Sequence, residues 1–119
     1  AIFASCGGGG LLSGSFLAKE ILSPKTLIFG SEPEQANDAY ISVKSGEIFK
    51  FSQSPDTIAD GLKTLAVSNR CYNYLKKLDD IFLVKEDDIL YWTNYCYEVL
   101  KIETEPSIEN PVLPDQPSP

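Results

Sequence analysis

The fold is decided by residues 1–29, which read AIFASCGGGGLLSGSFLAKEILSPKTLIF. Residues 1–5 form a short apolar run, which is typical of a buried strand in a parallel sheet. Four glycines follow, and residues 11–22 then have a helical spacing of apolar side chains that Pro24 ends. Residues 26–29 predict a second buried strand. Strand, helix and strand in this order predict a βαβ unit with a right-handed crossover.

The rest of the chain continues the alternation of helices and strands. We expect a short helix from residue 32 to about residue 46 and, after a turn-rich segment, another helix over residues 69–78. Residues 80–84 (DIFLV) predict a third strand, and residues 86–100 predict a longer amphipathic helix. The fold class is therefore α/β, a parallel sheet of about three strands with flanking helices. So small a sheet leaves edges and apolar faces uncovered, which predicts a homo-oligomer or a missing partner.

The composition changes after Ile102. Five of the eight prolines lie in the last fourteen residues, and proline donates no backbone hydrogen bond to a strand or helix. We therefore expect a domain over residues 1–105 and an extended, mobile, proline-rich tail over residues 106–119.

Charge and composition exclude several classes of function. The 119 residues include 10 basic and 17 acidic ones, a net charge of −7, which argues against nucleic acid as a partner. The longest apolar runs, such as residues 89–92, are too short to span a membrane. The absence of histidine excludes Ser–His–Asp nucleophiles and histidine-ligated metals. Three cysteines without Cys-x-x-Cys spacing indicate free thiols in a reducing compartment, so we expect a cytoplasmic protein.

The glycine run, residues 7–10, is the strongest functional signal. Consecutive glycines lose much chain entropy on folding, and their usual role is to turn backbone N–H groups toward one point without side chains in the way. Before a helix, that point is an anion site, and we expect it to bind a phosphate group. The competing interpretation is a tight turn that binds nothing.

Two nucleotide-binding motifs have glycines in a similar place. A Walker A loop ends in Gly-Lys-Ser/Thr, whereas Leu11 and Leu12 follow the glycines here, so nucleotide hydrolysis is not expected. Gly8-x-Gly10-x-x-Ser13 nearly fits the dinucleotide fingerprint, with Glu32 where a ribose-binding acid would lie. The third glycine of that fingerprint is missing. A Rossmann-like dinucleotide-binding module stays an alternative.

Five motifs, in order along the chain, resemble one enzyme family. Residues 7–14 (GGGGLLSG) are similar to the tetraglycine loop of serine racemase and threonine dehydratase, which are pyridoxal-phosphate enzymes of the tryptophan synthase β-like fold, fold type II. Residues 31–33 (SEP), 57–61 (TIADG), 80–84 (DIFLV) and 105–107 (EPS) resemble later turns and a strand of the same family. By this resemblance, residues 1–105 correspond to part of the family's large, cofactor-binding domain.

The resemblance also implies roles for particular residues. The cofactor phosphate would be held by the backbone of five residues: Gly7, Gly8, Gly9, Gly10 and Leu11. Gly61 would approach the pyridine ring, where a side chain would collide, and Glu105 would lie beside the ring.

A cation site is implied by the same resemblance. Serine racemases hold a divalent cation after the second strand through two acids and a backbone carbonyl, and the matching positions are Glu32, Ala36 (carbonyl) and Asp38. Oxygen ligands without histidine or cysteine suit Mg²⁺ or Ca²⁺. The competing interpretation is a solvated acidic loop.

The implied activity is that of a lyase acting on threonine or serine with release of ammonia, or of a serine racemase. This chemistry needs a Schiff-base lysine from a Ser-Phe-Lys-type motif on the amino-terminal side of the glycine loop, and none of the nine lysines lies in such a motif. The small domain and the Ser-Gly-Gly-Asn segment are also not found, so we expect no catalytic residue in this chain and a fragment inactive by itself. A non-catalytic remnant or interaction domain is a further alternative.

Overall fold

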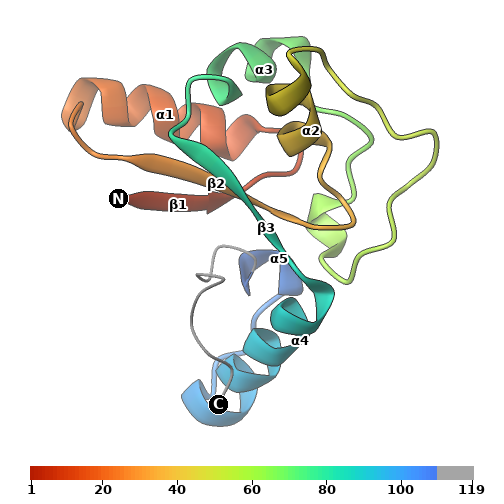
Figure 1. Ribbon diagram of the computed structural model, residues 1–119. Coiled ribbons are helices and arrows are strands. Elements are labelled where there is room, and N and C mark those ends of the chain that lie inside the picture. Colours follow the sequence, from red (N-terminus) through yellow and green to blue (C-terminus); the bar gives the residue numbers. More distant parts are fainter. Residues whose placement is uncertain (110–119) are drawn as a thin grey trace.

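The computed structural model describes residues 1–109, which form one parallel sheet with helices around it (Figure 1). The sheet has three strands in the order β1-β2-β3, with the bounds Ile2–Ser5, Ile28–Pro33 and Asp80–Val84. Both pairs of neighbouring strands are parallel. The predicted fold class is therefore confirmed.

Five α-helices and two irregular helical segments complete the described chain. Their bounds are Gly10–Leu22 (α1), Asp38–Ser45 (α2), Asn69–Leu75 (α3), Glu86–Tyr95 (α4) and Pro106–Glu109 (α5), with a 3₁₀ turn at Asp60–Leu62 (η1) and a π-helical segment at Cys96–Leu100 (η2). Helices α1, α2 and α3 lie on one side of the sheet, and α4 extends away from the end of β3 with α5 beside it (Figure 1). None of the helices in this part of the chain has the length and apolar character needed to cross a membrane.

The main hydrophobic core lies between the sheet and helices α1 to α3. It contains Leu12, Ile28, Leu75 and Ile81, each at most 4% exposed. Gly30 of β2 lets α1 approach closely, because a Cβ atom at this position would lie 2.8 Å from Leu12 Cδ2. A second, smaller cluster joins η1, β3 and α4.

The structure differs from the expected helix over residues 32–46. Glu32 and Pro33 belong to β2, and the helix begins only at Asp38. The pairing of β2 with β3 continues past Pro33, since Glu34 N–H donates to the Val84 carbonyl oxygen at 2.8 Å. A hydrogen bond to a residue fifty positions away is invisible in the local pattern, which is why the predicted helix start was wrong.

The segment after Ile102 also differs from the expectation. Pro106–Glu109 forms one helical turn rather than an extended chain. Proline is favoured at the first position of a helix, where its missing N–H group has no intrahelical acceptor. The rest of the expected tail, residues 110–119, lies outside the described residues.

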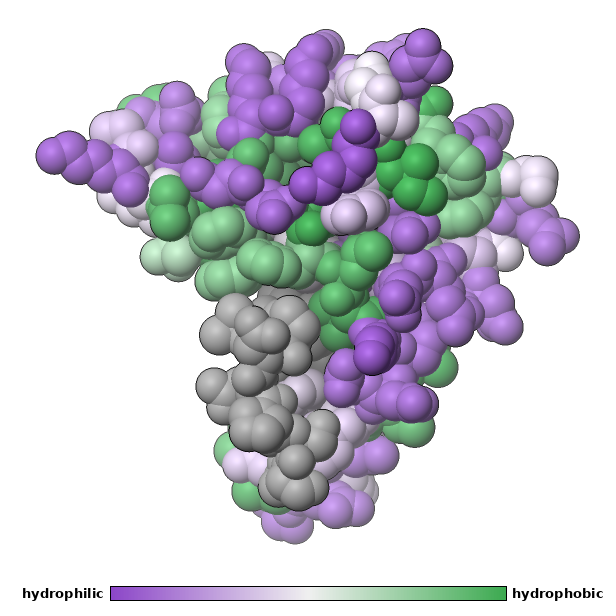
Figure 2. Space-filling view, in the orientation of Figure 1, coloured by the Kyte–Doolittle hydropathy of each residue, from purple (hydrophilic) through white to green (hydrophobic). Residues whose placement is uncertain are grey.

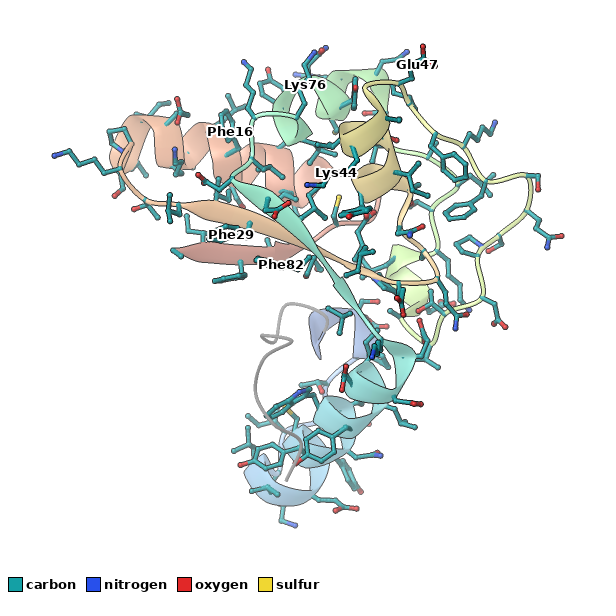
Figure 3. The ribbon with its side chains drawn as sticks, viewed as in Figure 1. Phe16, Phe29, Lys44, Glu47, Lys76 and Phe82 are labelled. Carbon is teal, nitrogen blue, oxygen red and sulfur yellow. The ribbon has the colours of Figure 1, made fainter. Side chains whose placement is uncertain are left out.

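The sheet face opposite α1 carries three phenylalanines. Phe3, Phe29 and Phe82 form a contiguous cluster, which we call the aromatic face, with ring centroids 4.9 Å apart for Phe3–Phe29 and 5.5 Å for Phe29–Phe82. All three side chains are half-buried. Phe29 and Phe82 point away from the side on which Phe16 lies (Figure 3). Apolar residues gather along the strands, whereas the helices above them are mainly hydrophilic (Figure 2).

Candidate functional site

The glycine loop joins the end of β1 to the start of α1. Cys6 N–H donates to the Ser31 carbonyl oxygen at 2.8 Å, which extends the β1–β2 pairing to the edge of the loop. Gly9 has a left-handed backbone with φ 89°, and a Cβ atom there would lie 2.9 Å from Cys71 Cβ. Both the turn and the contact with α3 therefore require glycine at position 9.

Gly8 and Gly10 have no such requirement. A Cβ atom at either position would meet nothing within 4 Å. Among residues 1–109, no acceptor is found for the N–H groups of Gly8, Gly9, Gly10 and Leu11. The loop thus presents unpaired donors and open space at the amino end of α1, which has 13 residues. Such an arrangement suits a phosphate group, because it offers several N–H donors and the positive end of the helix dipole.

Gly61 lies against the glycine loop although it is far away in sequence. A Cβ atom at Gly7 would lie 3.2 Å from the Gly61 carbonyl oxygen, so η1 and the loop are in contact. A Cβ atom at Gly61 would lie only 2.9 Å from Ser107 Oγ. A side chain at position 61 would therefore displace the Ser107 hydroxyl group, in addition to the collision with a ring that the family resemblance implies.

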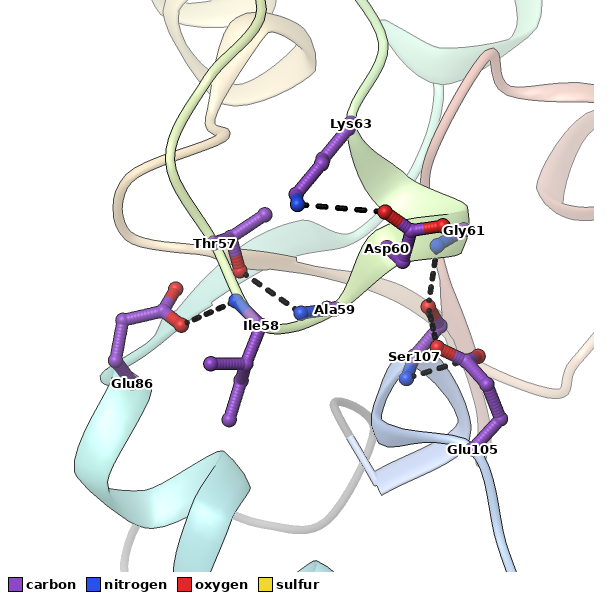
Figure 4. A network of polar contacts seen from close by, with 9 residues as sticks. All are labelled: Thr57, Ile58, Ala59, Asp60, Gly61, Lys63, Glu86, Glu105 and Ser107. Carbon is purple, nitrogen blue, oxygen red and sulfur yellow. Dashed lines mark hydrogen bonds and ion pairs between the residues drawn. The ribbon is translucent and has the colours of Figure 1, made fainter.

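Glu105 is connected to Gly61 by a short network of hydrogen bonds through Ser107 (Figure 4). Gly61 N–H donates to Ser107 Oγ at 2.9 Å, and Ser107 Oγ donates to Glu105 Oε1 at 2.9 Å. Ser107 N–H also donates to Glu105 Oε2 at 3.1 Å. The structure thus brings together the three elements that the sequence analysis assigned to the cofactor: the glycine loop, Gly61 and Glu105. Ser107 was missed as a site residue, and its only signal was its place in the Glu-Pro-Ser turn.

Glu32 lies near the carboxyl end of the central strand β2 and is completely buried. Its carboxylate accepts hydrogen bonds from Ala39 N–H at 3.0 Å and Tyr40 N–H at 2.7 Å, in the first turn of α2. Burial raises the pKa of Glu32 to about 8; the Tyr40 and Ala39 N–H donors lower it, and Asp38 raises it. Because both oxygens are bound inside the fold, Glu32 does not face outward as a ribose-binding acid would, and the dinucleotide alternative loses its acidic residue.

Asp38 lies beside Glu32 and is also completely buried. Neither of its carboxylate oxygens has a close, well-aligned hydrogen bond among the described residues, although polar groups of Thr64 and Val67 lie near the carboxylate. Burial raises the pKa of Asp38 to about 6, and its own backbone and polar groups of Thr64 and Val67 lower it only in part. The interpretation of Glu32 and Asp38 as a solvated acidic loop is therefore wrong.

The third residue of the expected cation site, Ala36, is buried in the turn between the two acids, where its N–H donates to the Pro33 carbonyl oxygen at 2.9 Å. Within residues 1–109, no group of three or more histidine, cysteine, aspartate or glutamate side chains could hold a metal ion. A cation here would depend on two carboxylates and a backbone carbonyl. The complete burial of the Glu32 and Asp38 carboxylates is consistent with that set of ligands.

Comparison with known proteins identifies the family to which the chain belongs. The family model described as pyridoxal-phosphate dependent enzyme matches residues 1–108. The L-threo-3-hydroxyaspartate ammonia-lyase of Saccharomyces cerevisiae is 40% identical over 108 residues, which are 90% of this chain and 33% of that protein. The serine racemase of Dictyostelium discoideum is 43% identical over 109 residues, again 90% of this chain and 33% of the relative.

Solved structures give the same result. The T.th. threonine deaminase superposes with a TM-score of 0.88 at 38% identity, over 92% of this chain and 40% of that one. Maize serine racemase superposes with a TM-score of 0.82 at 34% identity, over 88% of this chain and 32% of that one. The chain spans about a third of the length of the curated relatives it matches. Since the family match covers nearly the whole chain, this chain belongs to the family of pyridoxal-phosphate dependent enzymes.

Proposed function

We propose that this chain forms the phosphate-binding part of a pyridoxal-phosphate dependent enzyme that acts on an amino acid. The observation that carries the proposal is the glycine loop, with unpaired N–H donors and open space at Gly8 and Gly10. When bound, the cofactor would supply an electron sink for breaking a bond at Cα or Cβ of the substrate. The names of the relatives include ammonia-lyases and racemases. We rank ammonia release from threonine or serine first and serine racemisation second.

In this proposal the residues of the chain bind and orient the cofactor. Backbone N–H groups from Gly7 to Gly10, with that of Leu11, donate to the phosphate. Gly61 and Glu105 would lie beside the pyridine ring. None of the nine lysines lies in a Ser-Phe-Lys-type motif, so the reactive lysine and the binding site for the substrate carboxylate come from polypeptide outside residues 1–109.

We also propose a Mg²⁺ or Ca²⁺ ion between Glu32, the Ala36 carbonyl and Asp38. Support comes from the two buried carboxylates, which have no cationic side chain as a partner in residues 1–109. Adjacent buried negative charges are unfavourable unless a cation or a proton compensates for them.

The glycine loop can be tested by calorimetric titration with inorganic phosphate and with pyridoxal phosphate. Gly8→Val places a branched side chain in the open space before α1 without an unfavourable φ, so it blocks the site while the fold persists. We expect at least about a tenfold loss of affinity for both ligands, since donors to an anion are masked.

Gly14→Val is the matched control. Gly14 also has nothing within 4 Å of an added Cβ, but it lies one turn farther along α1. We expect this variant to bind both ligands as the parent does. Equal binding by Gly8→Val and the parent would contradict the proposed role of the loop.

A further inference from the structure

The hydroxyl group of Ser107 acts both as a donor and as an acceptor of hydrogen bonds. The single hydroxyl proton is donated to Glu105 Oε1, and the oxygen accepts the Gly61 N–H, each at 2.9 Å. The residue is 8% exposed, so water replaces neither bond easily. Ser107 therefore connects two segments that are 46 residues apart in sequence.

Glu105 depends on Ser107 for its orientation. Both oxygens of its carboxylate accept hydrogen bonds from Ser107, one from the hydroxyl and one from the backbone N–H. Glu105 is otherwise exposed, and no ion pair fixes it within residues 1–109. A carboxylate on the surface has many rotamers, and two hydrogen bonds from one residue select among them.

Gly61 in turn lies against the glycine loop at Gly7. Its N–H is bound to Ser107, while its carbonyl oxygen lies 3.2 Å from where a Gly7 Cβ would be. A continuous series of contacts thus runs from Glu105 through Ser107 and Gly61 to Gly7. Figure 4 shows the part of this series that joins Glu105, Ser107 and Gly61.

We propose that Ser107 is a positioning residue that holds Gly61 and the Glu105 carboxylate at a fixed separation beside the glycine loop, and so shapes the ring end of the cofactor site. This inference rests on the proposed function. In this inference Ser107 does not contact the phosphate group, which the glycine loop alone would bind. Loss of the hydroxyl group should therefore weaken binding of the whole cofactor more than binding of phosphate alone.

The test compares Ser107→Ala, Ser107→Thr and the parent chain. Calorimetry should show about a tenfold weaker Kd for pyridoxal phosphate in Ser107→Ala, with the Kd for inorganic phosphate unchanged within about twofold. Hydrogen exchange measured by NMR without ligand should show about tenfold faster exchange of the Gly61 amide. Ser107→Thr keeps the hydroxyl group and should restore both values.

Ser42→Ala is the matched control, because Ser42 is another buried serine whose hydroxyl joins two backbone segments, donating to Asp38 O and accepting from Phe49 N–H. It should lower the melting temperature without changing Gly61 exchange or the ratio of the two affinities. An unchanged Gly61 amide in Ser107→Ala would overturn the inference, as would an equal loss of both affinities. If the parent binds neither ligand, the proposed function fails, and Gly61 exchange still decides whether Ser107 holds that segment.

Discussion

The four glycines of the loop have different physical reasons to be glycine. Gly9 has the left-handed backbone and the contact with Cys71, whereas Gly8 and Gly10 face open space. Only the first kind of glycine can be explained by the fold. The second kind is expected if a ligand binds there, as proposed above, which makes Gly8 the better position for testing binding and Gly9 the better one for testing stability.

We predict that Gly9→Ala lowers the free energy of unfolding by roughly 1–3 kcal/mol, because the left-handed φ and the 2.9 Å approach to Cys71 Cβ both oppose a side chain. Gly8→Ala should change it by less than about 1 kcal/mol. Urea denaturation measures both variants.

Gly46→Ala separates the two causes at Gly9. Gly46 also has a positive φ of 85°, but nothing lies within 4 Å of an added Cβ. The difference between the free energies of unfolding lost in Gly9→Ala and in Gly46→Ala then measures the effect of the contact with Cys71. Equal stability of the Gly8 and Gly9 variants would show that the turn tolerates a side chain.

Prediction from sequence worked best at residues whose role is local. The glycine loop, its helix and the strand over residues 80–84 are visible as short patterns, and the structure has these elements at or near the expected positions. The role of Ser107 could not be predicted because it depends on Gly61, which reaches it only after the chain has folded. The same reason applies to Glu32, whose partners are amide groups of the next helix.

At the scale of elements, two buried acidic residues, Glu32 and Asp38, lie at the amino end of α2. Glu32 binds the first turn of the helix, and Asp38 begins it. Folding raises the pKa of Glu32 to about 8 and the pKa of Asp38 to about 6. At pH values between the unfolded and the folded pKa of each group, the folded chain therefore binds more protons than the unfolded chain. Their contribution to stability is complete below about pH 4 and is lost as the pH rises toward 8.

We therefore predict that a divalent cation has its largest stabilising effect at high pH, where the pair is ionised. In metal-free buffer the parent chain should lose stability between about pH 5 and pH 8 relative to Asp38→Asn, which removes one of the two charges. Millimolar Mg²⁺ or Ca²⁺ at about pH 8 should raise the melting temperature of the parent by about 5 °C, because a ligand that binds only the folded state stabilises it.

Differential scanning calorimetry of both chains, with and without metal, measures these effects. Asp38→Asn should show a flatter pH dependence and little response to the cation. A metal-dependent shift of the same size in Asp38→Asn would place the cation elsewhere in the protein.

At the scale of the whole molecule, helices α1 to α3 cover one side of the sheet within residues 1–109 (Figure 1). The aromatic face, formed by Phe3, Phe29 and Phe82, lies on the other side and is half-buried. Parallel sheets are usually covered on both faces. Because this face is apolar and only half-buried, we predict that copies of the chain associate through it.

We predict that the 119-residue chain binds the dye ANS and self-associates as its concentration rises, and that Phe82→Ser lowers both effects because it removes part of the apolar surface. ANS fluorescence and sedimentation velocity measure them. Phe51→Ser is the matched control, since Phe51 is a half-buried ring in a separate pair with Phe49, 5.0 Å between centroids. Equal effects of the two substitutions would exclude the aromatic face as the associating surface.

The contact series from Glu105 to Gly7 joins the beginning of the described chain to its last helix, which has a consequence for the order of events on the ribosome. Synthesis proceeds from the amino end, and a domain can begin to fold before it is complete. The βαβ unit that carries the glycine loop can therefore form early, while the residue that fixes Gly61 has not yet been made. We therefore expect the contact between Gly61 and Ser107 to form last in this series, because Ser107 is synthesised after the other residues that take part in it.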